Sequence, residues 1–112
     1  MYITIMDLHQ IYLHEMLKRL PEVDEDPNRL EAIITEIMLF KYKGTNHVQA
    51  CDYIGVYREH INLIELKRDY KASKARAQMV STKHRVEDFM QRRVKDMKMV
   101  IYRDGLYQVH YL

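Results

Sequence analysis

The chain has 112 residues, of which 47% are hydrophobic and 30% charged, with a formal net charge of +2. This length suits one domain plus an extension, and the composition is that of a folded protein rather than a disordered one. The lone cysteine, Cys51, excludes an internal disulfide framework, and we expect neither a signal peptide nor a membrane-spanning stretch. The expected location is therefore the cytoplasm.

Charge is distributed unevenly along the chain. Residues 1–66 contain six Lys or Arg and eleven Asp or Glu, whereas residues 67–99 contain eleven and four. The basic middle segment indicates a polyanion partner. A solvated helix face that balances the acidic N-terminal part explains the pattern equally well, so both interpretations stay open.

Two helices are expected in the first part of the chain. The first begins at Asp7, a good N-cap, carries an apolar stripe at helical spacing and ends at Pro21. Asp26 and Pro27 suit the N-cap and first position of a second helix, which ends near Gly44. Its apolar stripe is wide, which predicts that it is the central core helix.

Residues 44–66 are predicted to form a helix-turn-helix unit. Cys51 is small where two helices cross, and Gly55 suits a turn that requires positive φ. The apolar residues expected around the turn and on the inner face of the second helix are Ile54, Val56, Ile61 and Ile64. An ordinary helical hairpin needs many of the same residues and is the alternative.

A long basic amphipathic helix is expected to follow, because no Pro or Gly interrupts residues 56–104. Its apolar stripe breaks at residues 81–84, where a kink or a helical hairpin would fit. A single stripe cannot be buried alone, which predicts packing against the N-terminal helices or against other copies of the chain.

The last residues change to a β pattern. Asp104 and Gly105 between two β-prone runs predict a type I′ hairpin. The predicted pairs are Arg103 with Leu106, Tyr102 with Tyr107 and Val100 with Val109. A lone hairpin is marginal in water, so it is expected either to pack on the chain's own helices or to join the hairpins of neighbouring subunits.

Catalytic and metal-binding chemistry is not expected. The spacing of the histidines does not suit zinc, Cys51 is expected to be buried and inert, and no complete phosphate-binding loop surrounds Lys43. The acidic run at residues 22–26 is interpreted as a solvated loop. We therefore expect no enzyme activity, no cofactor and no metal site.

The candidate site residues fall into three groups. Base contacts with DNA are expected from Tyr57, Arg58, Glu59 and Asn62 at the start of the second helix of the unit. Phosphate contacts are expected from Lys43, Thr45, Lys67, Arg68, Lys71 and Lys74. Contacts between subunits are expected from Met79, Val86, Met90, Val94, Met97, Val100, Tyr102, Tyr107, Val109 and Tyr111. A solvated helix face is the alternative for each base-reading residue.

The run ACDYIGVYREHINLIELKRDYKASKARA resembles the N-terminal region of phage terminase small subunits. Those proteins often show Ala-Cys-x-x-x-Gly-(Ile/Val) before a polar recognition helix, and Ala50, Cys51, Gly55 and Val56 match the first part. The resemblance implies a ring-forming, non-enzymatic protein that binds the packaging site of viral DNA. It would present that DNA to the ATP-driven terminase large subunit in the host cytoplasm.

The expected fold is mainly α, with a helix-turn-helix domain over residues 1–68, a basic helical oligomerisation segment over 69–99 and a hairpin over 100–112. The expected function is viral DNA packaging by a homo-oligomeric ring that binds double-stranded DNA. The alternatives are a dimeric helix-turn-helix transcription regulator and a helical adaptor that binds another protein and not DNA.

Overall fold

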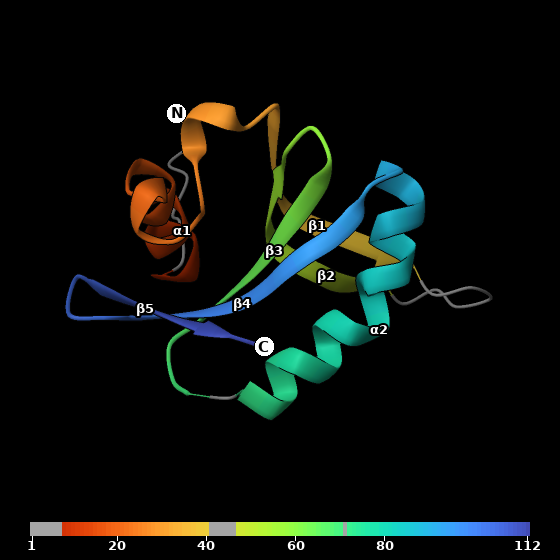
Figure 1. Ribbon diagram of the computed structural model, residues 1–112. Helices are drawn as coiled ribbons and strands as arrows, with labels where there is room; N and C mark the ends of the chain where they lie inside the picture. Colours follow the sequence, from red (N-terminus) through yellow and green to blue (C-terminus); the bar gives the residue numbers. More distant parts are fainter. Residues whose placement is uncertain (1–7, 41–46, 71) are drawn as a thin grey trace, which may run out of the picture.

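The computed structural model describes residues 8–40, 47–70 and 72–112, which fold as a mixed α/β protein around a five-stranded sheet (Figure 1). The helical elements are α1 (Leu8–Lys18), two 3₁₀ turns (Leu20–Glu22 and Pro27–Arg29) and α2 (Ala72–Met90). The strands are β1 (Ala32–Phe40), β2 (His47–Val56), β3 (His60–Lys67), β4 (Arg93–Arg103) and β5 (Leu106–Tyr111). The prediction of a mainly α fold is therefore wrong.

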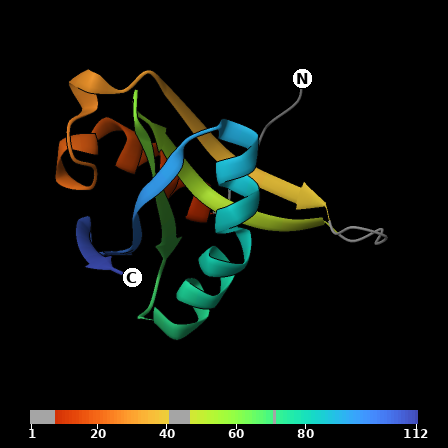
Figure 2. The same ribbon diagram turned by 45° about the vertical axis from the view of Figure 1, so that its right-hand side comes forward.

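The strands lie in the sheet in chain order, β1-β2-β3-β4-β5. Every neighbouring pair is antiparallel except β3 and β4, which are parallel. Parallel neighbours need a long crossover, and α2 supplies it along one face of the sheet (Figure 2). Helix α1 packs on the other face, so the sheet lies between α1 and α2.

Two apolar cores lie on opposite faces of the sheet. The core beneath α1 contains Leu13, Met16, Leu20, Val23, Tyr53, Ile64, Leu66, Val100 and Tyr102. The core beneath α2 contains Cys51, Ile54, Val56, Ile61, Leu63, Met79, Val86 and Val94. Strand β3 contributes to both, because successive side chains of a strand point to opposite faces. A strand buried on both faces shows no alternation of apolar and polar residues.

This double burial explains why the predicted helix-turn-helix is wrong. Residues 47–67 form β2 and β3, joined by a tight turn at Arg58 and Glu59. The apolar residues of β3 satisfy helical spacing only because nearly every position is buried. Their isoleucine-rich composition favours an extended chain, and the structure follows that local preference.

The second predicted helix is also a strand. Asp26 accepts a hydrogen bond at 3.2 Å from the backbone N–H of Asn28, so the predicted N-cap is confirmed. The helix that it caps is only the 3₁₀ turn Pro27–Arg29, and β1 follows. The β-branched run in β1 outweighs the helical spacing of its apolar residues. Asp7, the predicted start of the first helix, lies outside the described residues.

Gly55 lies inside β2 rather than at a turn. A Cβ atom at this position would come 2.5 Å from Asp24 Oδ2 and 2.7 Å from Tyr53 Oη. The glycine is required because the loop that carries Asp24 approaches the strand closely.

The predicted basic helix is confirmed only in part. Helix α2 runs without a break through residues 81–84 and ends at Met90. Gln91 then adopts a φ of 53°, which turns the chain into β4. None of the helices in the described part of the chain has the length and apolar character needed to cross a membrane.

The C-terminal hairpin is confirmed in register and in turn type. The three predicted pairs are present, and Asp104 and Gly105 have φ values of 52° and 74°, as a type I′ turn requires. Tyr107 Oη donates a hydrogen bond at 3.0 Å to the carbonyl of Tyr12. The hairpin therefore packs on a helix of its own chain.

Most residues predicted to contact other subunits lie in the two cores of this chain. Met79, Val86, Val94, Val100 and Tyr102 are buried, and Met90, Met97, Tyr107 and Val109 pack against them as partly buried residues. Only Tyr111 of this group is largely exposed, at 71%.

Candidate active site

Strands β2 and β3 separate at one end, and side chains of β2 replace the missing strand pairing. The ladder between them ends at Tyr53 and Ile64, although both strands continue. Beyond this point, the backbone N–H of Leu66 donates a hydrogen bond at 2.7 Å to Asp52 Oδ2. The thiol of Cys51 donates to the carbonyl of Ile64 at 3.2 Å. Asp52 is therefore fixed in the gap between the two strands.

Glu65 lies beside Asp52 in this gap. The register of the ladder, continued by one residue, places Glu65 opposite Asp52, and the two side chains are only 4% and 1% exposed. Burial raises the pKa of Glu65, and the negative charge of Asp52 raises that pKa further, while Lys67 opposes both effects. Two buried carboxyl groups side by side favour a shared proton or a bound cation.

One carboxylate oxygen of this pair has no partner. Among the described residues, Glu65 Oε2 is buried and receives no hydrogen bond. An unsatisfied buried carboxylate oxygen costs free energy, and such atoms in folded proteins call for a functional explanation. The geometry therefore indicates that a donor or a cation belongs at this position.

Lys67 completes the group on the same strand. Its position two residues after Glu65 places both side chains on the same side of β3. Lys67 Nζ lies 3.5 Å from Glu65 Oε1, and the lysine side chain is partly exposed. The charged end of Lys67 therefore connects the buried carboxylates to the surface.

Helix α1 contributes His9 to this group of side chains. His9 Nε2 lies 3.0 Å from Asp52 Oδ1. The imidazole ring contacts Tyr102 edge to face at 6.2 Å, and Tyr102 stacks on Tyr12 at 4.3 Å. These contacts position α1 against the carboxylate pair. We refer to Asp52, Glu65, Lys67 and His9 as the carboxylate–lysine site.

The backbone next to Asp52 on the other side is strained. Thr35 pairs with Tyr53 and Ile37 with Cys51, so Glu36 faces Asp52 from β1. Glu36 has a φ of 54°, which a residue with a side chain adopts at a cost of about 1–2 kcal/mol. Strain of this kind concentrates at functional sites.

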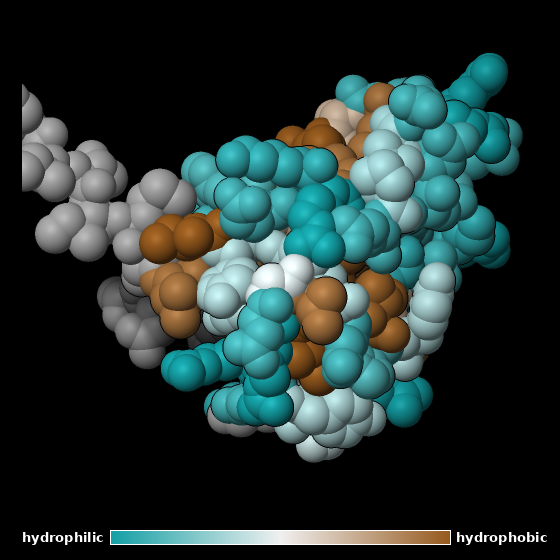
Figure 3. Space-filling model, turned by 90° about the vertical axis from the view of Figure 1, so that its left-hand side faces the viewer, coloured by the Kyte–Doolittle hydropathy of each residue, from teal (hydrophilic) through white to brown (hydrophobic). Residues whose placement is uncertain are grey.

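A hollow of about 500 Å³ is lined by sequence neighbours of Lys67 and His9, although the four residues of the carboxylate–lysine site are not part of its lining. Its lining residues are Leu8, Tyr12, Arg68, Asp69, Tyr102, Arg103 and Asp104. Arg68 follows Lys67 directly, and Leu8 precedes His9. Figure 3 views the molecule from the left-hand side of Figure 1 and shows a mostly hydrophilic face with separate apolar spots. Such a face suits a polar or charged ligand.

The predicted DNA-binding residues are not brought together. Tyr57 is buried and stacks on His60 at 4.9 Å, and Asn62 is buried under the acidic loop. Arg58 and Glu59 are exposed at the opposite end of β3 from Lys67. Lys67 and Arg68 lie in or beside the carboxylate–lysine site, and Lys74 is exposed on α2. Lys43, Thr45 and Lys71 lie outside the described residues.

The acidic run at residues 22–26 is not simply a solvated loop. Asp24 is buried and accepts hydrogen bonds from Tyr53 Oη at 2.5 Å and from Asn62 Nδ2 at 2.8 Å. Glu25 accepts a hydrogen bond from Asn62 and contacts His60 and Lys95. These contacts anchor the loop to the sheet, and we refer to Asp24 and Glu25 as the anchor cluster.

Sequence reasoning assigned no role to Asp52, Glu65 or His9. A detectable signal was the pair Glu65 and Lys67, which share a side only if the segment is a strand. In a helix, Glu65 and Lys67 would point in different directions. The helix prediction for this segment therefore hid their proximity. The predicted burial of Cys51 is confirmed, and burial raises the pKa of its thiol.

Comparisons with protein-family models, with curated proteins and with solved structures gave no match for this chain. Its function is therefore inferred from the geometry of the carboxylate–lysine site.

Proposed function

We propose that this protein is a divalent-cation-dependent nuclease, with Asp52, Glu65 and Lys67 as its catalytic residues. The observation that carries the proposal is the buried carboxylate pair, whose Glu65 Oε2 has no partner among the described residues and whose neighbour is a lysine. Two buried carboxyl groups side by side either share a proton or bind a cation, so the pair is a candidate cation site.

The donor set fits a small, hard cation. Mg²⁺ prefers oxygen ligands and is commonly held by one or two carboxylates together with substrate phosphate and water. Asp52 and Glu65 would supply the two carboxylates, and no group of three candidate ligand side chains converges within the described residues. When bound, such a cation neutralises phosphate charge and makes water a better nucleophile.

The substrate class follows from charge. A cation shared between protein carboxylates and a ligand phosphate predicts a phosphate ester as substrate. Arg68 follows Lys67 directly in the sequence, and the exposed side chains of Lys74 and Arg76 continue the basic segment into α2. Several exposed cations on this segment favour a polyanion with many phosphates over a single small phosphate ester.

In the reaction, a water oxygen forms a bond to phosphorus and the bond from phosphorus to one ester oxygen breaks. The products are a phosphate monoester and a free hydroxyl group. Lys67 is placed to donate hydrogen bonds to the phosphoryl oxygens, where negative charge builds up in the transition state. Asp52 is held in position by Leu66 and His9, so it needs little rearrangement when the substrate arrives.

The packaging hypothesis loses its structural basis in this fold. It rested on a helix-turn-helix over residues 44–66, and the described part of that segment is β2, a turn and β3. The expectation of nucleic acid as the partner is retained here, with nucleic acid as the substrate.

The test is cleavage of plasmid, duplex and single-stranded substrates by the purified chain with Mg²⁺, Mn²⁺ or a chelator. We expect cleavage only with a cation, and a loss of at least about 100-fold in rate for Asp52→Asn, Glu65→Gln and Lys67→Met. Matched controls are Glu59→Gln and Lys18→Met, which change exposed residues of the same type and should leave the rate unchanged. Cleavage that persists in Glu65→Gln, or in the chelator, would refute the proposal.

A further inference from the structure

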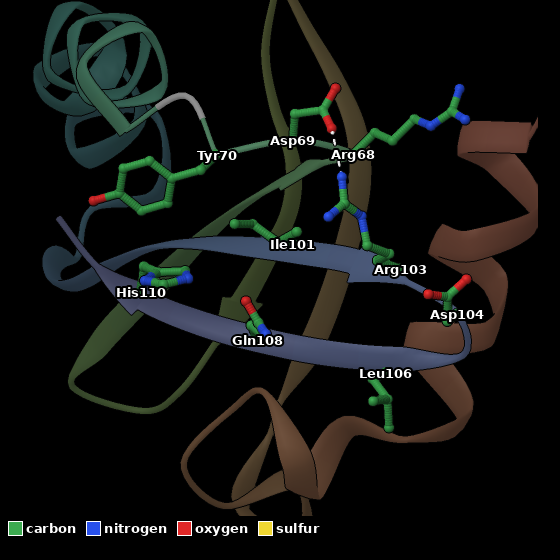
Figure 4. A pocket seen from close by; sticks show the side chains of 9 residues that line it. All are labelled: Arg68, Asp69, Tyr70, Ile101, Arg103, Asp104, Leu106, Gln108 and His110. Carbon is green, nitrogen blue, oxygen red and sulfur yellow. Dashed lines mark hydrogen bonds and ion pairs between the residues drawn. The ribbon is translucent and has the colours of Figure 1, made fainter.

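The hollow near the carboxylate–lysine site adjoins a second hollow of about 370 Å³. The two share Arg68, Asp69, Arg103 and Asp104 as lining residues, and we refer to the second hollow as the trough. The trough is lined in addition by Tyr70, Ile101, Leu106, Gln108 and His110 (Figure 4). It therefore lies between the segment that follows β3 and the β4–β5 hairpin.

The floor of this trough is the face of the hairpin that points away from α1. Val100 and Tyr102 fill the core beneath α1, so Ile101 and Arg103 point to the other face. Gln108 pairs with Ile101 and therefore lies on that same face. Helix α2 covers only its inner part, where Ala75 packs on Met99 and Ile101.

An aromatic side chain stands at the far end of the trough. Tyr70 follows Lys67 by three residues and is 66% exposed. Its ring contacts His110 edge to face at 5.1 Å, and Figure 4 shows both rings on the same side of β5. His110 Nε2 is buried and has no hydrogen-bond partner among the described residues. This end offers the exposed ring of Tyr70 to a ligand.

Cations and this ring occur together along the trough. Arg68 and Arg103 both line the trough, and Arg103 pairs there with Asp69 at 3.2 Å. That pair is exposed and contributes little free energy, so the guanidinium of Arg103 is free to exchange the carboxylate for a phosphate. Phosphate-binding cations next to an aromatic stacking surface are the combination that binds single-stranded nucleic acid.

We propose that the trough binds single-stranded polynucleotide, with one base stacked on Tyr70 and the adjoining phosphates at Arg68 and Arg103. Its use in substrate selection rests on the proposed nuclease function, whereas the binding itself does not. A single strand is required because the base faces of a duplex are already covered by their neighbours, which leaves none for Tyr70.

The test measures binding by fluorescence anisotropy in a chelator, where cleavage is not expected. The probes are labelled oligothymidylate, oligouridylate and a blunt duplex, each against wild type, Tyr70→Ala and Tyr70→Phe. We expect Tyr70→Ala to weaken binding of single strands about 5- to 150-fold and Tyr70→Phe to leave it unchanged, because stacking needs only the ring. Binding of the duplex should not respond to either substitution. Tyr111→Ala, which removes an equally exposed tyrosine that follows His110 on β5, is the matched control.

Equal single-strand binding by wild type and Tyr70→Ala would overturn the proposal, as would an equal loss for the duplex or for Tyr111→Ala. Comparison of the two single-stranded probes distinguishes DNA from RNA as the preferred source of the bases. A chain that binds single strands through Tyr70 but cleaves nothing with any cation would refute the nuclease function and leave this inference intact.

Discussion

The anchor cluster and the carboxylate–lysine site are both pairs of acidic residues held against β3, yet their environments differ. Burial alone would raise the pKa of Glu25, but hydrogen bonds from Asn62, His60 and Lys95 outweigh it and lower that pKa to about 2. Burial and Asp52 raise the pKa of Glu65, and only Lys67 opposes them. The Glu25 carboxylate therefore has several hydrogen-bond donors around it, whereas the Glu65 carboxylate has too few to stabilise its negative charge.

This difference separates a structural role from a functional one. The carboxylates of the anchor cluster have protein partners on several elements, so they stabilise the fold and gain nothing from a ligand. The carboxylate–lysine site keeps an oxygen that receives no hydrogen bond from the described part of the chain, so there is a cost there that a ligand can remove. Acidic clusters in a fold of unknown function can be sorted by this criterion.

The largest expected effect is on the anchor cluster. Asp24→Ala removes a buried carboxylate and leaves Lys98 buried with its nearest opposite charge gone, since the two lie 4.0 Å apart. We expect a loss of about 3–5 kcal/mol in the free energy of unfolding, measured by urea denaturation. Asp69→Ala, in an exposed pair with Arg103, should cost less than about 1 kcal/mol. Similar losses from both substitutions would mean that Asp24 is not an anchor.

An intermediate effect is expected from a divalent cation. At a concentration of about 100 times its dissociation constant, Mg²⁺ should raise the free energy of unfolding by about 2.7 kcal/mol, because it binds only the folded chain. Glu65→Gln should abolish this increase, and Glu25→Gln should retain it. Thermal unfolding with and without Mg²⁺ measures both. An increase that survives in Glu65→Gln would place the cation elsewhere.

Some elements of this fold could be predicted from the sequence and others could not. The hairpin at Asp104 and Gly105 was predictable because its turn chemistry is local and requires positive φ at two residues. The first helix and the capping role of Asp26 were local as well. The strands β1 to β3 were not predictable from spacing, because burial on both faces removes the alternation that identifies a strand.

The carboxylate–lysine site could not be predicted, because the strands that form it were not predicted. Asp52 and Glu65 meet only because β2 and β3 pair, and then separate, in a specific register. His9 reaches Asp52 from a distant part of the chain. The acidic run at 22–26 was visible in the sequence, but its burial depends on Gly55, which admits the loop close to β2. Contacts of this kind arise from tertiary structure and leave no local pattern.

The smallest expected effect is the gain in the free energy of unfolding that Glu65→Gln produces when no divalent cation is present. Because the pKa of Glu65 is raised in the folded chain above its ordinary value of 4.5, the folded state binds the proton more tightly than the unfolded state. This contribution to stability is present below pH 4.5 and is lost as the pH rises through the raised pKa. Near neutral pH without a cation, we expect Glu65→Gln to be more stable than wild type by about 1–2 kcal/mol.

The pH dependence of this gain distinguishes the two clusters. The advantage of Glu65→Gln should shrink as the pH falls toward 4.5, because the unfolded wild-type chain then also takes up the proton that Glu65 holds in the folded state. Glu25→Gln should behave in the opposite way, since the pKa of about 2 makes the Glu25 contribution present above pH 4.5 and lost below it. Urea denaturation between acidic and neutral pH measures both differences. If Glu65→Gln were less stable than wild type at neutral pH, the Glu65 carboxylate would be a satisfied structural group like Glu25, and the contrast between the two clusters would disappear.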